Sequence, residues 1–208
     1  MRKLILDLDN TIYPVKSIGE KLFAPLFDLL KSTEYHLDES VIAQAKEQIM
    51  RIPFQKVAAE FNFPPALFDA AMGILRNLTF DDPMHFFEEY SLIRELDTQK
   101  FLLTTGYQKL QESKIRSLEI ENDFTEIFIV DPDTSELVKK DVMLHIMEKY
   151  QISPSQLLVV GDDPESEIKA AKELGISSFL LDPVESYPNT AATHKGSTLA
   201  DLVKYIVS

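Results

Sequence analysis

Two aspartates near the start of the chain stand where their carboxylates can act together. Asp7 and Asp9 are separated by one leucine and follow an apolar run at residues 4–6. Side chains alternate between the faces of a strand, so both carboxylates project to one side, roughly 6 to 7 Å apart in extended chain. At that separation the two charges either repel each other or share a cation, and repulsion raises one pKa. One carboxylate can then act as nucleophile and the other as acid.

The same residues also have a purely structural interpretation. Asp7 and Asp9 can be aspartates at the entrance of a loop in which Asn10 forms a turn. A D-x-D-x-T or D-x-D-x-V string arises by chance in roughly one in ten chains of this size. The position directly after an apolar run favours the chemical interpretation.

Two later segments carry groups that suit an anionic ligand. The run FLLTTG at 101–106 ends in Thr104 and Thr105, whose hydroxyls, with nearby N–H groups, suit a phosphate oxygen. For either threonine alone, helix capping is the simpler explanation. The run VKK at 138–140 puts lysine at a predicted helix start, where it opposes the helix dipole and favours an anion. A solvated surface pair explains those lysines equally well.

A fourth segment, LLVVGDDPESE, ends an apolar run in Asp162 and Asp163. Asp163 is explained as the N-cap of a helix with Pro164 at its first position and Gly175 just past its end. Asp162 needs another reason, and a hard cation bound by oxygen ligands supplies one.

The elements that position these groups follow from the apolar pattern. Continuous apolar runs, typical of strands buried on both faces, occur at residues 4–6, 101–103, 127–130, 157–160 and 178–181. Helical patterns lie between them. One of these spans residues 107–118, with Tyr107, Leu110, Ile115 and Leu118 on one face and its Gln, Lys, Glu and Arg residues on the other. The chain is therefore predicted to be an α/β protein with a parallel sheet.

The stretch between the first two strands has a different texture. Residues 15–90 contain several amphipathic segments and no convincing strand, and they are far too long for an α/β connection. We therefore expect a Rossmann-like core formed by residues 1–14 and 91–208, with residues 15–90 inserted as a helical cap.

Composition limits the partners. The chain has 208 residues, a net charge of −13 and no cysteine. This acidity opposes binding to nucleic acid polymers and anionic membranes, and no apolar stretch has membrane-spanning length. We expect a cytoplasmic protein that acts on a small molecule, and no pattern indicates an oligomeric state.

Taken as a set, DLDNT, LLTTG, the helix-starting lysine and VVGDDPESE resemble the four motifs of the haloacid dehalogenase-like (HAD) hydrolase superfamily. The resemblance covers residues 1–14 and about 92–182 and implies a Rossmann-like core with a helical cap after the first motif. It implies that Asp7 is the nucleophile and Asp9 the general acid and base. It also implies a phosphate site and an Mg²⁺ site. The phosphate ligands are Thr104, Thr105 and Lys139, and the metal ligands are Asp7, the main-chain carbonyl of Asp9, and Asp162.

Two assignments stay open at this point. Lys140 is the alternative to Lys139, which is preferred because the apolar Met143 follows it by four residues. The later acid of the fourth motif is Glu167 where the family usually has aspartate, and whether Glu167 or Asp163 contributes to the metal site is open.

The resemblance favours an Mg²⁺-dependent phosphomonoester hydrolase that forms an aspartyl-phosphate. Haloacid dehalogenases need neither a metal nor an acid two positions after the nucleophile, whereas a phosphatase must protonate its leaving group, so Asp9 favours phosphatase. The DxDNTxYP wording resembles pyrimidine 5′-nucleotidases, which suggests a nucleoside monophosphate; a sugar phosphate is the other candidate. Signalling receiver domains use similar groups, but in another chain order and without an inserted helical domain.

Overall fold

The computed structural model describes residues 2–207 and contains one six-stranded parallel sheet. The strand order is β3-β2-β1-β4-β5-β6, and every neighbouring pair is parallel. The strands are β1 (Lys3–Leu6), β2 (Lys100–Thr105), β3 (Glu126–Val130), β4 (Leu157–Gly161), β5 (Ser177–Leu181) and β6 (His194–Gly196). The first five coincide with the predicted apolar runs, whereas the short β6 was not predicted. The α/β Rossmann-like fold class is thus confirmed.

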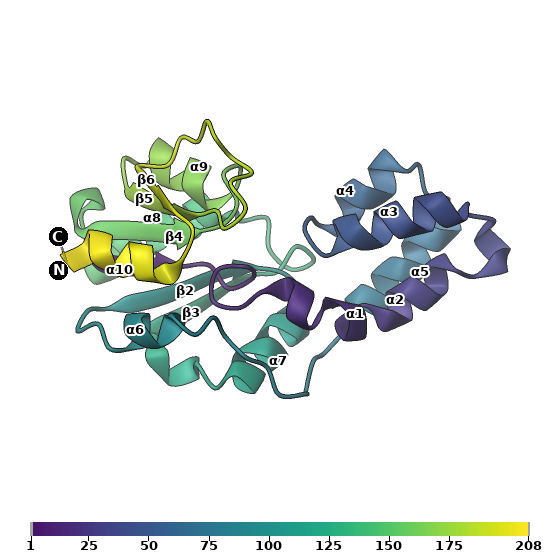
Figure 1. Cartoon of the computed structure of the whole chain (residues 1–208), viewed down its shortest axis with the longest axis horizontal. Coiled ribbons are helices and arrows are strands. Elements are labelled where there is room, and N and C mark those ends of the chain that lie inside the picture. Colours follow the sequence, from purple (N-terminus) through teal and green to yellow (C-terminus); the bar gives the residue numbers. More distant parts are fainter. Residues whose placement is uncertain (1, 208) are drawn as a thin grey trace.

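Helices cover both faces of the sheet (Figure 1). On one face lie α8 (Lys139–Tyr150) and α9 (Glu167–Glu173), and on the other lie α6 (Tyr90–Arg94), α7 (Gln108–Leu118) and α10 (Leu199–Val207). Successive side chains of β1 point to opposite faces of the sheet. Leu4 and Leu6 belong to the apolar cluster under α7 and α10, and Ile5 belongs to the cluster under α8 and α9. Burial on both faces explains why these strands read as unbroken apolar runs.

Two local predictions need correction. The helix expected to start at Pro164 begins at Glu167, because residues 163–166 form a turn in which Asp163 Oδ1 accepts a hydrogen bond of 2.8 Å from the Glu165 N–H. The polar residues of α7 are not all on its exposed face. Gln111, Ser113 and Lys114 are buried. The buried side of this helix, which packs against the rest of the protein, is therefore partly polar.

The inserted segment forms a lobe of helices on the side away from both chain ends (Figure 1). Its helices are α1 (Gly19–Leu22), α2 (Ala24–Leu30), α3 (Glu39–Ile49), α4 (Phe54–Glu60) and α5 (Pro65–Leu75). No strand occurs in the described residues 15–90. One apolar cluster runs continuously from Leu6 in the sheet to Val57 and Leu67 in this lobe. The limits of 15 and 90 for a separate cap domain stay a prediction.

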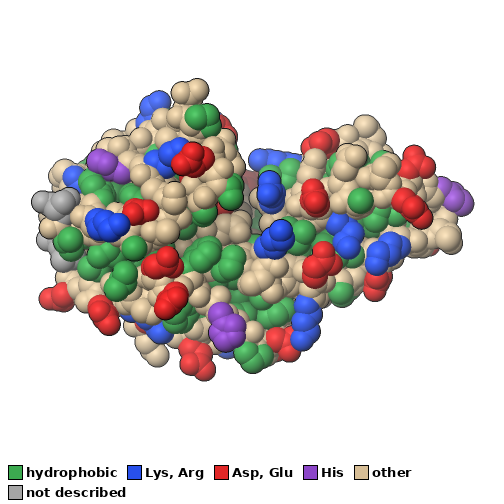
Figure 2. Space-filling view, viewed as in Figure 1, with side chains coloured by type: hydrophobic (Ala, Val, Ile, Leu, Met, Phe, Trp, Pro, Cys, Tyr) green, Lys and Arg blue, Asp and Glu red, His purple; other side chains and the backbone are tan. Residues whose placement is uncertain are grey.

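The surface view shows where the two lobes meet. A notch separates the larger lobe from the smaller one, and Lys or Arg side chains of the smaller lobe lie along its edge (Figure 2).

Among residues 2–207, no helix has both the length and the apolar character needed to cross a membrane.

Candidate active site

The predicted site residues gather at one edge of the sheet. Asp7 directly follows β1, Asp162 directly follows β4, and Thr104 lies at the end of β2. Because β2, β1 and β4 are parallel neighbours, their carboxyl ends lie side by side, where sheets of this type place their ligand sites. The Asp7 N–H donates to the Val160 carbonyl at 2.9 Å, which continues the β1–β4 pairing and fixes the Asp7 backbone.

Lys139 links two of the carboxylates at this edge. Its ammonium lies 2.6 Å from Asp7 Oδ1 and 2.7 Å from Glu167 Oε2, and all three side chains are buried. Lys140, the alternative candidate, instead pairs with Glu173 at 2.7 Å on the surface. The first residue of α8 is therefore the lysine that reaches Asp7. Burial alone would lower the pKa of Lys139, but the charges of Asp7 and Glu167 raise it above its usual range.

Asp7, Asp162 and Glu167 form a compact cluster of carboxylates. One oxygen of each lies within 4.8 Å of the others. Burial raises the pKa of Asp7 to about 7, with Lys139 opposing and Glu167 adding to the shift. Burial and the charge of Asp7 raise the pKa of Asp162 to about 8. The pKa of Glu167 is lowered, because Lys139 outweighs the effect of burial. When all three carboxylates are ionised, the cluster therefore carries more negative charge than Lys139 neutralises.

Two details of this cluster suit a hard cation. Within residues 2–207, the Asp162 carboxylate and Asp7 Oδ2 accept no hydrogen bond, so both have oxygen lone pairs available. Carboxylate oxygens are the ligands that Mg²⁺ prefers. Gly161 allows this packing, since a Cβ there would lie 2.1 Å from Glu167 Oε1. Asp163 is not part of the cluster, because its carboxylate caps the turn before α9.

Asp9 has a different set of neighbours. Its Oδ1 accepts hydrogen bonds from the Tyr13 hydroxyl and, at 2.8 Å, from the Lys114 ammonium. Its Oδ2 accepts from Lys114 at 3.2 Å and from the Gln111 amide at 3.1 Å. Burial alone would raise the pKa of Asp9, but Lys114, Tyr13 and Gln111 together lower it. Burial and the neighbouring Asp9 raise the pKa of Tyr13 well above its usual value.

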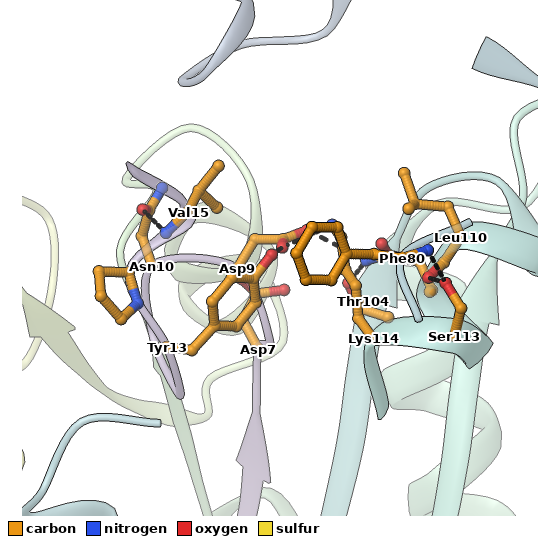
Figure 3. A network of polar contacts seen from close by, with 12 residues as sticks. Asp7, Asp9, Asn10, Tyr13, Val15, Phe80, Thr104, Leu110, Ser113 and Lys114 are labelled. Carbon is orange, nitrogen blue, oxygen red and sulfur yellow. Dashed lines mark hydrogen bonds and ion pairs between the residues drawn. The ribbon is translucent and has the colours of Figure 1, made fainter. Parts of the chain in front are cut away.

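The loop that carries Asp9 is fixed by Asn10. Asn10 has φ of +56°, a left-handed conformation that asparagine tolerates better than most residues, and its Oδ1 accepts from the Val15 N–H at 3.1 Å. The turn proposed as the structural alternative for this segment therefore exists. It does not replace the chemical interpretation, because Asp7 and Asp9 lie beside each other at the site (Figure 3).

The two threonines at the end of β2 differ. Thr104 is buried, and its Oγ1 accepts a hydrogen bond of 2.6 Å from Gln111 Nε2. Thr105 is exposed and makes no side-chain hydrogen bond with the described residues. Thr104 thus lies in the same network as Asp9, whereas Thr105 does not. Neither contact assigns a phosphate-binding role, and both roles stay predictions.

Sequence reasoning missed three residues of the site: Tyr13, Gln111 and Lys114. The signal for the last two was present. Gln111 and Lys114 share a helical stripe with Ile115 and Leu118, so a periodicity of 3.6 places two polar residues on the apolar face. A buried lysine requires a charged partner, and that requirement points to an acid elsewhere in the chain.

Solved structures with this architecture include hydrolases of more than one kind. YfnB from Bacillus subtilis, in a magnesium-bound structure, matches with a TM-score of 0.70 and 18% identity, covering 100% of this chain and 99% of that chain. A HAD phosphatase from Thermococcus onnurineus matches with a TM-score of 0.66 and 15% identity, covering 99% and 98%. A dehalogenase matches with a TM-score of 0.61 and 13% identity, covering 100% and 98%. These similarities establish the fold.

Sequence comparison adds the family. No curated protein matches the chain. The family model described as haloacid dehalogenase-like hydrolase matches residues 4–181, which include β1 apart from its first residue, β2 to β5, the inserted helices and the carboxylate cluster. The chain therefore belongs to the haloacid dehalogenase-like hydrolase family, and it is an enzyme of that family.

Proposed function

We propose that the chain is an Mg²⁺-dependent phosphomonoester hydrolase that forms an aspartyl-phosphate on Asp7. The observation that carries the proposal is the pairing of a nucleophile candidate that has a free oxygen with a second carboxylate, Asp9, two residues later. A dehalogenase needs no such acid, whereas hydrolysis of an alkyl phosphate requires a proton for its leaving group. The T. onnurineus neighbour, a HAD phosphatase, supports the same reading.

The reaction follows from the roles of the two aspartates. The carboxylate of Asp7 attacks phosphorus, and the bond between phosphorus and the ester oxygen breaks. Asp9, which Lys114, Tyr13 and Gln111 keep charged in the substrate-free protein, must take up a proton when the substrate binds and gives that proton to the departing oxygen. Asp9 then takes a proton from water, which attacks phosphorus and releases inorganic phosphate and free Asp7. Thr104 and Lys139 are the proposed ligands of the phosphoryl oxygens, and Thr105 is a weaker candidate because it is exposed.

The carboxylate cluster fits the proposed cofactor. Asp7, Asp162 and the main-chain carbonyl of Asp9 would hold Mg²⁺, with Glu167 bound directly or through water. The cation would offset the repulsion between the attacking carboxylate and the phosphoryl oxygens. The unpaired carboxylate of Asp162 supports this ligand set, because a buried carboxylate without a donor is unfavourable unless a cation compensates it.

The proposed substrate is a small phosphorylated metabolite. A nucleoside monophosphate is suggested by the DNT-x-YP wording at residues 9–14, and a sugar phosphate is the other candidate. Selectivity would reside in the helical cap, residues 15–90. The second candidate function, haloacid dehalogenation, rests on the similarity to a dehalogenase structure.

A substrate screen tests the proposal. Purified protein is assayed for phosphate release from nucleoside monophosphates, sugar phosphates and p-nitrophenyl phosphate, and for halide release from 2-haloacids, each with Mg²⁺ and with EDTA. The proposal predicts phosphate release that stops with EDTA and returns when Mg²⁺ is restored. Full phosphatase activity without metal would overturn the Mg²⁺ role, and halide release as the main activity would favour the dehalogenase.

A further inference from the structure

Lys114 is a buried cation for which the reaction above has no use. Its side chain is 5% exposed and projects from the middle of α7 to Asp9. A buried ammonium is unfavourable without a charged partner, and Asp9 is the partner that the structure supplies. Two hydrogen bonds, one to each carboxylate oxygen, restrict rotation of the Asp9 side chain more than a single contact would.

Gln111, about one helical turn before Lys114, joins two parts of the site. Its amide nitrogen donates to Asp9 Oδ2 at 3.1 Å and to Thr104 Oγ1 at 2.6 Å. An amide NH₂ group has two hydrogens, so both bonds can exist at once. Gln111 therefore holds a carboxylate that follows β1 and a hydroxyl at the end of β2 in a fixed relation.

The contacts at Asp9 use its whole acceptor capacity. A carboxylate has about four lone-pair sites, and here Oδ1 accepts from Tyr13 and Lys114 while Oδ2 accepts from Gln111 and Lys114. The direction of the carboxylate is thereby fixed by three side chains. For Asp9 to carry a proton to an oxygen of the substrate, one of these donors must move away, while the remaining donors keep the orientation of the carboxyl group.

The same helix is attached to the connection between cap and core (Figure 3). The Phe80 N–H donates to Ser113 Oγ at 2.8 Å, and Ser117 Oγ donates to the Phe80 carbonyl at 2.9 Å. Ser113 is the neighbour of Lys114 in the chain. A single helix thus holds both the carboxylate of Asp9 and the segment that returns from the cap.

We propose that Lys114 and Gln111 are positioning residues that orient Asp9 toward the leaving group, while Gln111 also orients Thr104. The inference rests on the phosphatase function proposed above. Correct placement of Asp9 matters most when the departing oxygen needs a proton, so the two residues should affect alkyl phosphates more than aryl phosphates. A residue that only stabilised the fold would affect both substrates equally.

The test compares Lys114→Met and Gln111→Leu with the wild type on an alkyl phosphate and on p-nitrophenyl phosphate, at saturating Mg²⁺. We expect kcat of each variant to fall about 10- to 100-fold on the alkyl phosphate and less than about 3-fold on the aryl phosphate. Gln111→Leu should also raise KM on both substrates, because Thr104 loses its donor. Arg116→Met, an exposed position of the same helix, is the matched control and should behave as the wild type.

A double variant separates positioning from structure. If Lys114 acts through Asp9, adding Lys114→Met to Asp9→Asn should change the kcat of the Asp9→Asn protein less than 2-fold. Circular dichroism and the Tm of each variant establish folding, and Gln111→Leu carries the test if Lys114→Met does not fold. Equal losses in kcat on both substrates in folded variants, or additive losses in kcat in the double variant, would overturn the inference. Absence of Mg²⁺-dependent phosphatase activity in the wild type would instead refute the proposed function.

Discussion

The two aspartates that follow β1, Asp7 and Asp9, each bond to a buried lysine, but the two pairs differ in charge balance. Lys139 bonds to two of the three clustered carboxylates, and the pKa values of Asp7 and Asp162 are raised to about 7 and about 8. Lys114 serves Asp9 with help from neutral donors, and the pKa of Asp9 is lowered. We call the carboxylate cluster with Lys139 the first half of the site; it lacks positive charge when its carboxylates are ionised. Asp9 with its three donors is the second half, and the protein itself balances its charge.

This difference indicates which half of the site requires a bound ligand to balance its charge. A cluster of buried carboxylates with too few donors is unfavourable until a cation or protons compensate it. A carboxylate that already accepts four hydrogen bonds from three side chains gains nothing from a cation and keeps one orientation. We therefore expect changes in the first half to alter metal binding and changes in the second half to alter proton transfer.

The largest expected effect comes from Asp7→Asn. The amide cannot attack phosphorus, so turnover should fall by more than about 10⁴-fold and no phosphoenzyme should form. Folding should survive, because Lys139 keeps Glu167 as a partner. Acid-quenched reactions with a radiolabelled phosphate ester detect the phosphoenzyme. An Asp7→Asn protein with wild-type activity would remove Asp7 from the mechanism.

The second effect separates the two halves through Asp9→Asn. The variant keeps the shape of the side chain and the main-chain carbonyl, but it cannot deliver a proton. Activity should fall about 10²- to 10⁴-fold on alkyl phosphates and much less on p-nitrophenyl phosphate, whose leaving group needs little protonation. Mg²⁺ affinity, measured by titration of the remaining activity, should stay near that of the wild type. Equal losses on both kinds of substrate would refute the acid role.

The sheet was predictable because each strand is buried on both faces. Unbroken apolar runs ending in polar residues located β1, β2 and β4, and with them Asp7, Thr104 and Asp162. The resemblance that these motifs carry to the haloacid dehalogenase-like hydrolases is confirmed by the family match. The short β6 escaped because its three residues, HKG, contain no apolar run.

The rest of the site depends on contacts between distant segments. Lys114 and Asp9 are 105 positions apart, and no local pattern shows that a lysine within a helix faces an aspartate after a strand. The spacing to Met143 favoured Lys139 over Lys140 in the sequence, but only the rotation of α8 shows that Lys139 is the lysine that contacts Asp7. The start of α9 was misplaced because Asp163 caps a turn as well as it could cap a helix.

A smaller effect is expected when the first half loses one carboxylate. Asp162→Asn removes a charged group from the cluster, and Mg²⁺ affinity should fall at least about 10-fold. Mutation of a residue that only hydrogen-bonds to a metal ligand already lowers metal affinity by that factor. The ratio of activity on alkyl and aryl phosphates at saturating Mg²⁺ should not change, because Asp9 keeps its donors. Asp163→Asn is the matched control, since that carboxylate caps a turn. A change in the substrate ratio would contradict the separation into halves.

The smallest expected effect is a pH dependence of metal stabilisation. In the metal-free protein the pKa values of Asp7 and Asp162 are raised to about 7 and about 8, above those of unfolded aspartate. Their protonated forms therefore favour folding at low pH, and this contribution is lost as the pH rises through those values. Mg²⁺ must displace protons at pH 6 but binds charged carboxylates at pH 8.5, which is worth about 1.4 kcal/mol per pH unit for each proton displaced.

Mg²⁺ should consequently raise the Tm more at pH 8.5 than at pH 6, by about 2 to 4 °C for each kcal/mol of difference in a chain of this length. Calorimetry at both pH values, with Mg²⁺ and with EDTA, measures the difference. Asp162→Asn should reduce it, because one of the two titrating carboxylates is gone. Asp9→Asn should leave it unchanged, because Lys114 and the other donors lower the pKa of Asp9, so that this carboxylate is charged at both pH values in the substrate-free protein. An equal Tm shift at pH 6 and pH 8.5 would show that the carboxylates of the first half are no more protonated than those of the second.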